Sequence, residues 1–335
     1  MNTNAGQGNN ERPIFIFGSP RSGTSLISRI LNAHPTIGIP YESLLYSTFW
    51  PIRSSYGDLA NPANAKQLLR HMLAWGPVAK WEPPVTLDAA MERVETSDFH
   101  GLFRAIIKAW VDAQGKQRWG EKSPWHAFHW REILTGFPDA RIVHIVRDVR
   151  DATLSWKLAR QGPRNTMILA RRWAAYMDLM EQVRAGWPAD AFKQIRYEDL
   201  LADPEASSRE LCDFLQEPYD PSMLKFHDAG GSYNTDATNR ANLARPIMAD
   251  NQGKWESRLS AAEVRWIEAM AGEQMTRFGY TRSVTDARIS RPERLWITMV
   301  SNPVSRVAGM AQDRKGQREG IQKLLFPLMA RLRRS

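Results

Sequence analysis

The chain has 335 residues, of which 43% are apolar and 24% are charged, so a folded protein with a sizeable core is expected rather than a disordered one. Its single cysteine, Cys212, excludes an internal disulfide and any metal site built from paired cysteines, and we expect it in the core of an amphipathic helix. The net charge of +9 resides mainly in residues 291–335, which hold ten Lys or Arg and three acidic residues, so we expect no nucleic-acid binding by the main domain.

Residues 1–11 are polar and are expected to form a flexible N-terminus. They contain no apolar stretch typical of a secretory signal, and no run of about 18 apolar residues occurs elsewhere in the chain. These features predict a cytoplasmic protein without a transmembrane helix.

Apolar runs and helical periodicity place the secondary structure in chain order. The strands are expected at 13–17, 140–146 and 192–197. Residues 140–146 are nearly continuously apolar, as is typical of a parallel strand buried on both faces. The helices are expected at 24–32, at several places within 61–115, and at 125–136, 148–160, 165–186, 206–215 and 261–278. This alternation predicts an α/β fold, with a parallel central sheet flanked by helices, in a domain spanning residues 12–284.

The segment from Gly18 to Ser25 joins the first strand to the first helix and has the sequence GSPRSGTS. Glycines let the backbone amides turn inward, and the N-terminus of the following helix adds partial positive charge, so this loop is suited to bind a phosphate or sulfate. The spacing of the glycines matches the ATPase loop, but Thr24 stands where an ATPase has Lys. The cation lies instead inside the loop, at Arg21.

This loop resembles the phosphosulfate-binding loop of sulfotransferases that use 3′-phosphoadenylyl sulfate (PAPS). A second segment, Ile145 to Ser155, resembles the family's 3′-phosphate motif, in which an Arg and a Ser stand eight residues apart. The pattern is most similar to the branch of tyrosylprotein and bacterial sulfotransferases, which also carries an Arg in the loop, a His-Pro after the first helix (here His34-Pro35) and a Glu beyond it. The resemblance implies a P-loop-NTPase-like sulfotransferase fold and an enzyme of the EC 2.8.2 type.

The resemblance also implies roles for individual residues. It implies Glu42 as the general base for an acceptor with a free hydroxyl, and Arg21 and Lys122 as cations at the reacting group. It implies that the nucleotide, released as 3′-phosphoadenosine 5′-phosphate (PAP), is bound without metal by Pro20, Arg21, Ser22, Gly23, Thr24, Ser25, Arg147, Ser155, Tyr197, Asn239 and Arg245. Lys122 is flanked by Glu121 and Ser123 where relatives often have Asn and Asp.

The residues themselves leave alternatives open. Glu42 is equally compatible with a solvated carboxylate, and Ser155 with a helix surface. A nucleotide-dependent kinase of related fold and a non-catalytic nucleotide-binding protein are the alternative functions. The acceptor is open among a glycan, a small molecule and a protein tyrosine, and the numerous Trp residues are expected mostly in the core, with some at an acceptor pocket.

Residues 285–335 form a separate feature. Within them, Ile321, Leu324, Leu325, Leu328, Met329 and Leu332 recur at helical spacing among basic residues, which predicts a basic amphipathic helical tail. Such a tail is a candidate contact with the main domain, with a second subunit as a dimer, or peripherally with the inner membrane surface.

Overall fold

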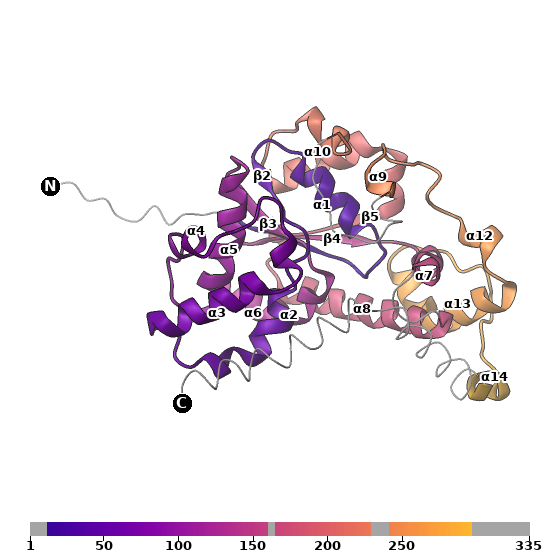
Figure 1. Cartoon of the computed structure of the whole chain (residues 1–335). Helices are drawn as coiled ribbons and strands as arrows, with labels where there is room; N and C mark the ends of the chain where they lie inside the picture. The colour runs from indigo at the N-terminus through magenta and orange to yellow at the C-terminus, as the bar shows by residue number, and fades with distance from the viewer. Residues whose placement is uncertain (1–11, 160–164, 229–240, 297–335) are drawn as a thin grey trace.

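A five-stranded parallel sheet forms the centre of the protein. The structure, a computed structural model, describes residues 12–159, 165–228 and 241–296. The strand order is β2-β3-β1-β4-β5, and each neighbouring pair is parallel. The strands are β1 (Ile14–Phe17), β2 (Ile37–Gly38), β3 (Arg118–Glu121), β4 (Arg141–Val146) and β5 (Phe192–Arg196) (Figure 1). The predicted α/β class with a parallel central sheet is therefore confirmed.

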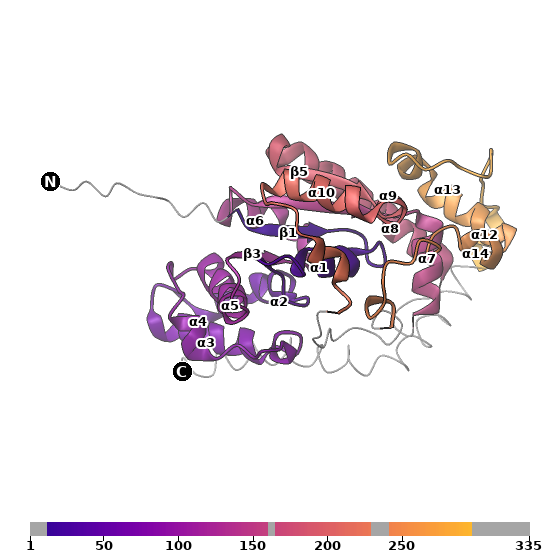
Figure 2. The ribbon, with the colours of Figure 1, turned by 90° about the horizontal axis from the view of Figure 1, so that it is seen from above.

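Helices fill the connections between the strands. The α-helices are α1 (Thr24–Asn32), α2 (Leu45–Phe49), α3 (Pro62–Ala74), α4 (Leu87–Met91), α5 (Phe99–Ala113), α6 (Trp130–Gly136), α7 (Val149–Leu158), α8 (Thr166–Gly186), α9 (Tyr197–Ala202), α10 (Pro204–Leu215), α12 (Trp255–Arg258), α13 (Ala261–Arg277) and α14 (Arg291–Trp296). Five short 3₁₀ segments are η1 (Trp50–Tyr56), η2 (Val78–Lys80), η3 (Pro124–His129), η4 (Ala189–Ala191) and η5 (Pro221–Lys225). Figure 2 shows α2 to α5 grouped beside the β3 side of the sheet, with α12 and α13 at the opposite end.

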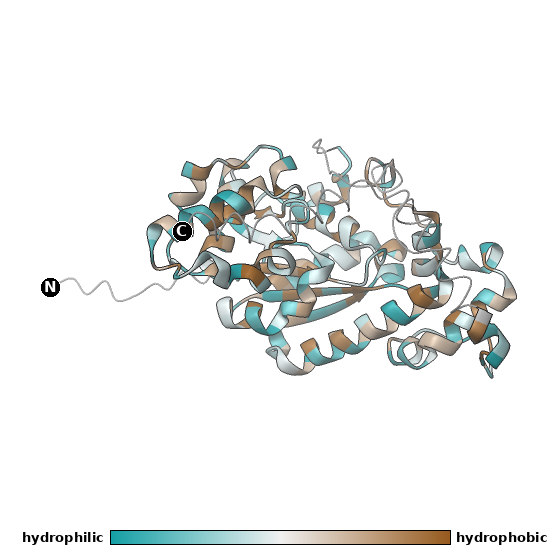
Figure 3. Cartoon of the chain, turned by 60° about the horizontal axis from the view of Figure 1, so that its bottom comes forward, coloured by the Kyte–Doolittle hydropathy of each residue, from teal (hydrophilic) through white to brown (hydrophobic). Residues whose placement is uncertain are grey.

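Alternating side chains of the strands build two separate apolar cores. Ile14 and Ile16 of β1 pack in one core with residues of α1, α9 and α10, whereas Phe15 and Phe17 pack in the other with residues of α5, α8 and α13. Cys212 is 1% exposed in the first core, as predicted. Figure 3 shows the apolar colouring of the sheet and the mixed colouring of the helices that cover it. Burial of both faces fits the continuous apolar runs of β1 and β4.

Two strands could not be predicted from hydropathy. β2 has only two residues, and β3 has the sequence RWGE, with charged residues at both ends. These charges are buried with partners: Arg118 lies 3.1 Å from Glu217, and Glu121 lies 2.9 Å from His126. Because these partners offset the cost of burying the charges, β3 can occupy an inner position of the sheet although its sequence is not apolar.

Other differences are local. The helix expected at 125–136 begins as the 3₁₀ segment η3, whose first residue is Pro124, and it becomes α-helical only at Trp130. The predicted tail contains α14, but residues 321–332 lie outside the described part of the chain. In the described part, no helix is long and apolar enough to cross a membrane.

The carboxyl ends of the strands gather the chemistry predicted from the sequence. The loop after β1 begins at Gly18, β3 is followed by Lys122, β4 by Arg147 and β5 by Tyr197. From β1 the chain goes first to β2 and β3 on one side of the sheet and then to β4 and β5 on the other. The strand order therefore reverses at β1, and α/β sheets bind ligands at the carboxyl end of the strands where the order reverses.

Candidate functional site

The loop after β1 has a backbone that only particular residues can adopt. Gly23 has φ +97°, and a Cβ there would lie 2.4 Å from Cδ2 of Tyr197. A Cβ on Gly18 would lie 2.7 Å from the carbonyl oxygen of Ile145. Arg21 holds a left-handed conformation at φ +74°, a strained backbone of the kind often found where a loop binds a ligand.

The N-terminus of α1 faces this loop without a side-chain cap. Gly23 occupies the cap position and offers no side chain to the first N–H groups of the helix. Those N–H groups have no partner within a helix, so they are available to an anion. The hydroxyls of Thr24 and Ser25 stand at the same end of the helix.

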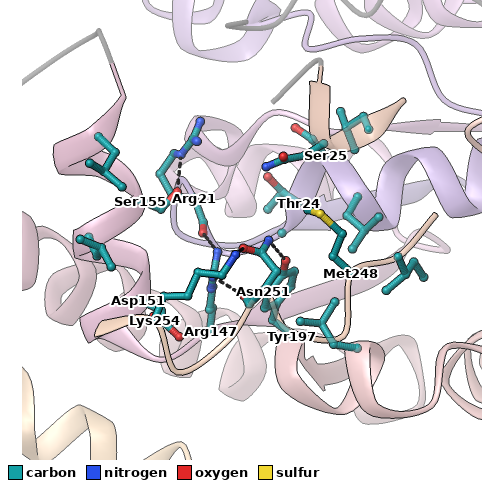
Figure 4. Close-up of a pocket in the computed structure, with 18 of the residues that line it drawn as sticks. Arg21, Thr24, Ser25, Arg147, Asp151, Ser155, Tyr197, Met248, Asn251 and Lys254 are labelled. Carbon is teal, nitrogen blue, oxygen red and sulfur yellow. Dashed lines mark hydrogen bonds between the residues drawn. The ribbon is translucent and has the colours of Figure 1, made fainter. Parts of the chain in front are cut away.

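A pocket of about 320 Å³ opens beside the loop (Figure 4). Its polar lining comes from the loop and the start of α1, the end of β4, α7, the start of α9, and residues 242–258. It comprises Arg21, Thr24, Ser25, Arg147, Asp151, Ser155, Tyr197, Asn242, Asn251, Lys254 and Arg258. Apolar residues close much of the rest, among them Leu154, Leu243, Ile247 and Met248. A polar end and an apolar wall in one cavity suit a phosphorylated nucleoside.

Two arginines link the loop to the helix after β4. Nε of Arg21 donates to Oγ of Ser155 at 3.1 Å. The guanidinium of Arg147 donates to the carbonyl oxygen of Arg21 at 3.3 Å and lies 4.3 Å from the centre of the Tyr197 ring. Arg147 is only 6% exposed, and its buried Nε has no hydrogen-bond partner in the described part of the chain. The arginines of the two predicted phosphate motifs therefore meet in one pocket.

The segment before α12 closes the far side of the pocket. Nδ2 of Asn251 donates to the Tyr197 hydroxyl at 2.8 Å, and Nζ of Lys254 donates to Oδ1 of Asn251 at 3.1 Å. Asp151 of α7 accepts the backbone N–H groups of Gly253 and Trp255, at 2.6 and 3.0 Å. Burial raises the pKa of Asp151, although Arg147 and these two backbone donors oppose the rise. Asp151 thus holds the segment before α12 in place, and Arg147 and the two backbone donors compensate its negative charge.

Glu42 and Lys122 form a second polar group at the Ser25 end of the loop. Nζ of Lys122 donates to Oε1 of Glu42 at 2.6 Å and to Oγ of Ser25 at 3.2 Å. The Lys122 side chain is completely buried, whereas that of Glu42 is 23% exposed. Lys122 therefore links the loop to Glu42, a carboxylate that a molecule arriving from solvent can reach.

Buried Glu121 ties the chain segments of this pair together. Its Oε1 accepts the backbone N–H and the hydroxyl of Ser43, at 3.1 and 2.8 Å, and the hydroxyl of Ser123 at 2.6 Å. His126 lies 2.9 Å from Oε2. Burial favours a raised pKa for Glu121, but His126 and the two hydroxyls outweigh it and hold the pKa below its usual value. Ser43 follows Glu42 and Glu121 precedes Lys122, so this network sets the position of one segment against the other.

A known protein family matches most of the sequence that forms the sheet and the loop. A model of the sulfotransferase family matches residues 13–221, which is more than half of the chain. The chain belongs to the sulfotransferase family. The resemblance stated from the loop and the Arg147–Ser155 motif is therefore confirmed.

Relatives within the sulfotransferase family are distant in sequence. Protein-tyrosine sulfotransferase A of Caenorhabditis elegans is 24% identical over 297 residues, covering 84% of this chain and 70% of that protein. Sulfotransferase Stf3 of Mycobacterium bovis, named for omega-hydroxy-beta-dihydromenaquinone-9, is 27% identical over 187 residues, covering 51% of this chain and 43% of that protein. An uncharacterized protein of Aquifex aeolicus is 27% identical over 230 residues, covering 65% of this chain, which spans only 27% of the Aquifex protein.

Solved structures show the same fold. The sulfotransferase domain of the curacin biosynthetic pathway aligns with a TM-score of 0.54 at 18% identity, over 80% of this chain and 98% of that domain. The sulfotransferase domain of the Synechococcus PCC 7002 olefin synthase aligns with a TM-score of 0.55 at 21% identity, over 80% of this chain and 94% of that domain. Both confirm the predicted sulfotransferase fold.

The sulfotransferase residues predicted from the sequence fall into three sets. One set lines the 320 Å³ pocket: Arg21, Gly23, Thr24, Ser25, Arg147, Ser155 and Tyr197. A second set lies next to it. Lys122 bonds to Ser25 and to Glu42, Ser22 is buried within the loop with its hydroxyl unpaired in the described part, and Pro20 lines a different cavity. In the third set, Arg245 is exposed and does not line the pocket, and Asn239 lies outside the described residues.

Two residues of the candidate site were not predicted to take part in it. Asn251 bonds to both Tyr197 and Arg147. The resemblance points to a late loop that includes Arg245 and Lys254-Trp255, but it does not single out Asn251 within that loop. Glu121 stands out in the sequence only as a departure from the family pattern, and its buried network depends on contacts with distant Ser43.

Proposed function

We propose that the protein transfers a sulfuryl group from PAPS to a hydroxyl of an acceptor. The observation that carries the proposal is the convergence of Arg21, Arg147 and Ser155 on one pocket beside an uncapped helix N-terminus. Cations and amides fixed before the reaction stabilise charge that develops on a leaving phosphate, and this electrostatic contribution is usually the largest in catalysis.

The residues present fit this nucleotide. The loop and the N-terminus of α1 would hold the 5′-phosphosulfate, and Arg147 with Ser155 would hold the 3′-phosphate. Two buried polar atoms, Nε of Arg147 and Oγ of Ser22, have no partner in the described part of the chain and can bond to such oxygens. Gly23 lets the Tyr197 ring lie against the loop, because a Cβ at position 23 would be 2.4 Å from that ring.

The bound nucleotide supplies the activated sulfur: its bond to the phosphate oxygen breaks, with the electron pair staying on that oxygen, as the bond to the acceptor oxygen forms. Glu42 takes the proton of the acceptor hydroxyl. Lys122 holds Oε1 of Glu42, and no described residue donates to Oε2, so Oε2 is the atom available to that proton. Lys122 and Arg21 place positive charge at the reacting oxygens.

The acceptor group is assigned from chemistry. Two named relatives are a protein-tyrosine sulfotransferase and a sulfotransferase for an omega-hydroxy compound, and both names specify hydroxyl acceptors. A carboxylate that accepts the proton of the attacking hydroxyl commonly contributes a factor of about 10² to 10⁴ in rate. Such a base suits an alcohol or a phenol.

The experiment combines turnover with binding. The protein is incubated with PAPS and a panel of alcohols and phenols, and products are examined for the mass of an added SO₃ group. For Glu42→Gln we expect kcat to fall by about 10² to 10⁴ while the Kd of PAP changes less than about threefold, because the carboxylate acts on the proton and not on the nucleotide. Failure of the wild-type protein to bind PAP or to sulfate any acceptor would refute the proposal.

A further inference from the structure

A second cavity lies on the other side of the phosphate loop and has no role in the site described above. Its volume is about 220 Å³, and it is lined by Ser19, Pro20, Trp125, Phe128, Ala152, Thr153, Trp156, Leu169, Arg172, Trp173, Ala175 and Tyr176. Helix α7 separates the two cavities: Asp151 and Ser155 face the pocket for the nucleotide, and Ala152 and Trp156 face the second cavity. The size is below the usual range of about 300–1,000 Å³ for drug-sized ligands, which indicates a small ligand or part of one.

The walls of this cavity favour an apolar ring. Trp125 and Phe128 are 41% and 55% exposed, and their rings stack 6.0 Å apart at an angle of 22°. Two large aromatic side chains left in solvent at the mouth of a cavity are typical of a binding surface. Among the described residues of the lining, Arg172 is the one charged side chain, and none carries a carboxylate or a carboxamide. A sugar needs several such hydrogen-bonding groups, so a planar apolar body suits the cavity better.

The position of the cavity connects it to the reacting residues. Tyr176, in its wall, accepts the N–H of Gly18 at 3.1 Å and donates to the carbonyl oxygen of Pro124 at 2.8 Å. The cavity therefore lies between the phosphate loop and η3, the segment that follows Lys122. Trp125 is three residues beyond Lys122, so their Cα atoms are at most about 11 Å apart. The cavity wall and Lys122 therefore belong to neighbouring parts of one short segment.

We propose that this cavity binds the aromatic body of the acceptor and directs its hydroxyl to Glu42 and Lys122, which makes small aromatic alcohols and phenols the preferred substrates. This inference rests on the proposed function for the transfer step, in which the acceptor oxygen gains the sulfuryl group, its proton passes to Glu42 and PAP leaves. Trp156 adds a specific contact, because its buried Nε1 has no hydrogen-bond partner in the described part of the chain and can donate to an oxygen of the ligand.

The test measures binding separately from turnover. The binding probe is 2-methoxynaphthalene, which has the rings but no hydroxyl to react, titrated calorimetrically into the protein saturated with PAP. The variants are Trp125→Ala and Phe128→Ala, whose exposed side chains can be shortened without opening the core. Leu295→Ala is the matched control, since Leu295 is 61% exposed on α14 and lines neither cavity.

We expect each aromatic variant to weaken binding of the probe about tenfold and to raise KM for 2-naphthol by a similar factor, with the Kd of PAP unchanged, because each removes a ring from the surface that contacts the ligand. Leu295→Ala should change none of these values. Hexan-1-ol and methyl β-glucoside should have a higher KM than 2-naphthol.

The outcomes separate the two proposals. If the protein sulfates the glucoside or hexanol in preference to naphthol, or if the aromatic variants bind the probe as the wild type does, the assignment of this cavity is wrong while the sulfotransferase activity stands. If no acceptor is sulfated, the proposed function fails, and loss of probe binding in the variants would still identify the cavity as a site for aromatic ligands.

Discussion

Replacing Arg147 by Lys separates recognition of the 3′-phosphate from recognition of the rest of the nucleotide. Arg147 is 6% exposed, its guanidinium donates at 2.7 Å to the carbonyl oxygen of Asn251, and it packs 4.3 Å from the Tyr197 ring. Lysine keeps the charge but loses the planar group that can contact a phosphate with two nitrogens.

The size of the effect follows from the bonds lost. A hydrogen bond to a charged group contributes about 1.5–3 kcal/mol, so losing the paired contact should cost about 2–3 kcal/mol and weaken PAP binding about 30- to 150-fold. Adenosine 5′-monophosphate differs from PAP by the 3′-phosphate alone. Its affinity should change less than about threefold, since Arg147 has no 3′-phosphate to contact there.

The assay is a calorimetric titration of both nucleotides into the wild type and Arg147→Lys. Arg258→Lys is the control, because Arg258 also lines the pocket but is exposed at its edge. We expect this control to change both affinities little. An equal loss for PAP and adenosine 5′-monophosphate in Arg147→Lys would show that Arg147 does not bind the 3′-phosphate and would refute the assigned orientation of the nucleotide.

Two further predictions concern buried groups. For Glu121→Gln we expect kcat to fall about tenfold with an unchanged Kd for PAP, because the network that sets Glu42 against Lys122 loses its charged acceptor; an equal loss of PAP affinity would contradict this positioning role. His144 is fully buried, and burial lowers its pKa from 6.5 to about 3. A histidine with a lowered pKa in the folded state destabilises the protein as pH falls below 6.5, here by about 2 kcal/mol at pH 5 relative to pH 8. Urea unfolding of His144→Leu should therefore show a smaller loss of stability between pH 8 and pH 5 than the wild type, and identical losses would contradict the assignment.

The predictable parts of the fold are the elements whose own residues show how they are buried, such as strands with apolar side chains on both faces. β1 and β4 are buried on both faces and read as continuous apolar runs, and the boundaries of α1 agree with the structure at both ends. β3 was missed because its charges at Arg118 and Glu121 are compensated by residues distant in sequence, and hydropathy does not record such pairing.

The same distinction applies to the site. Arg21 and Arg147 were predicted from family motifs and strand ends, and both line the 320 Å³ pocket. Asn251 and the role of Glu121 depend on how separate segments meet, and no spacing within one segment specifies that. Among the Trp residues, Trp75 and Trp119 are fully buried core residues, whereas Trp125 lines a cavity, a difference that their similar sequence settings do not show.

A crystal structure of the protein with PAP tests the central claim most directly. The proposal predicts the 5′-phosphate against the loop and the N-terminus of α1, and the 3′-phosphate within hydrogen-bond distance of Arg147 and Ser155. A nucleotide bound in the reverse direction, or bound outside the 320 Å³ pocket, would contradict it.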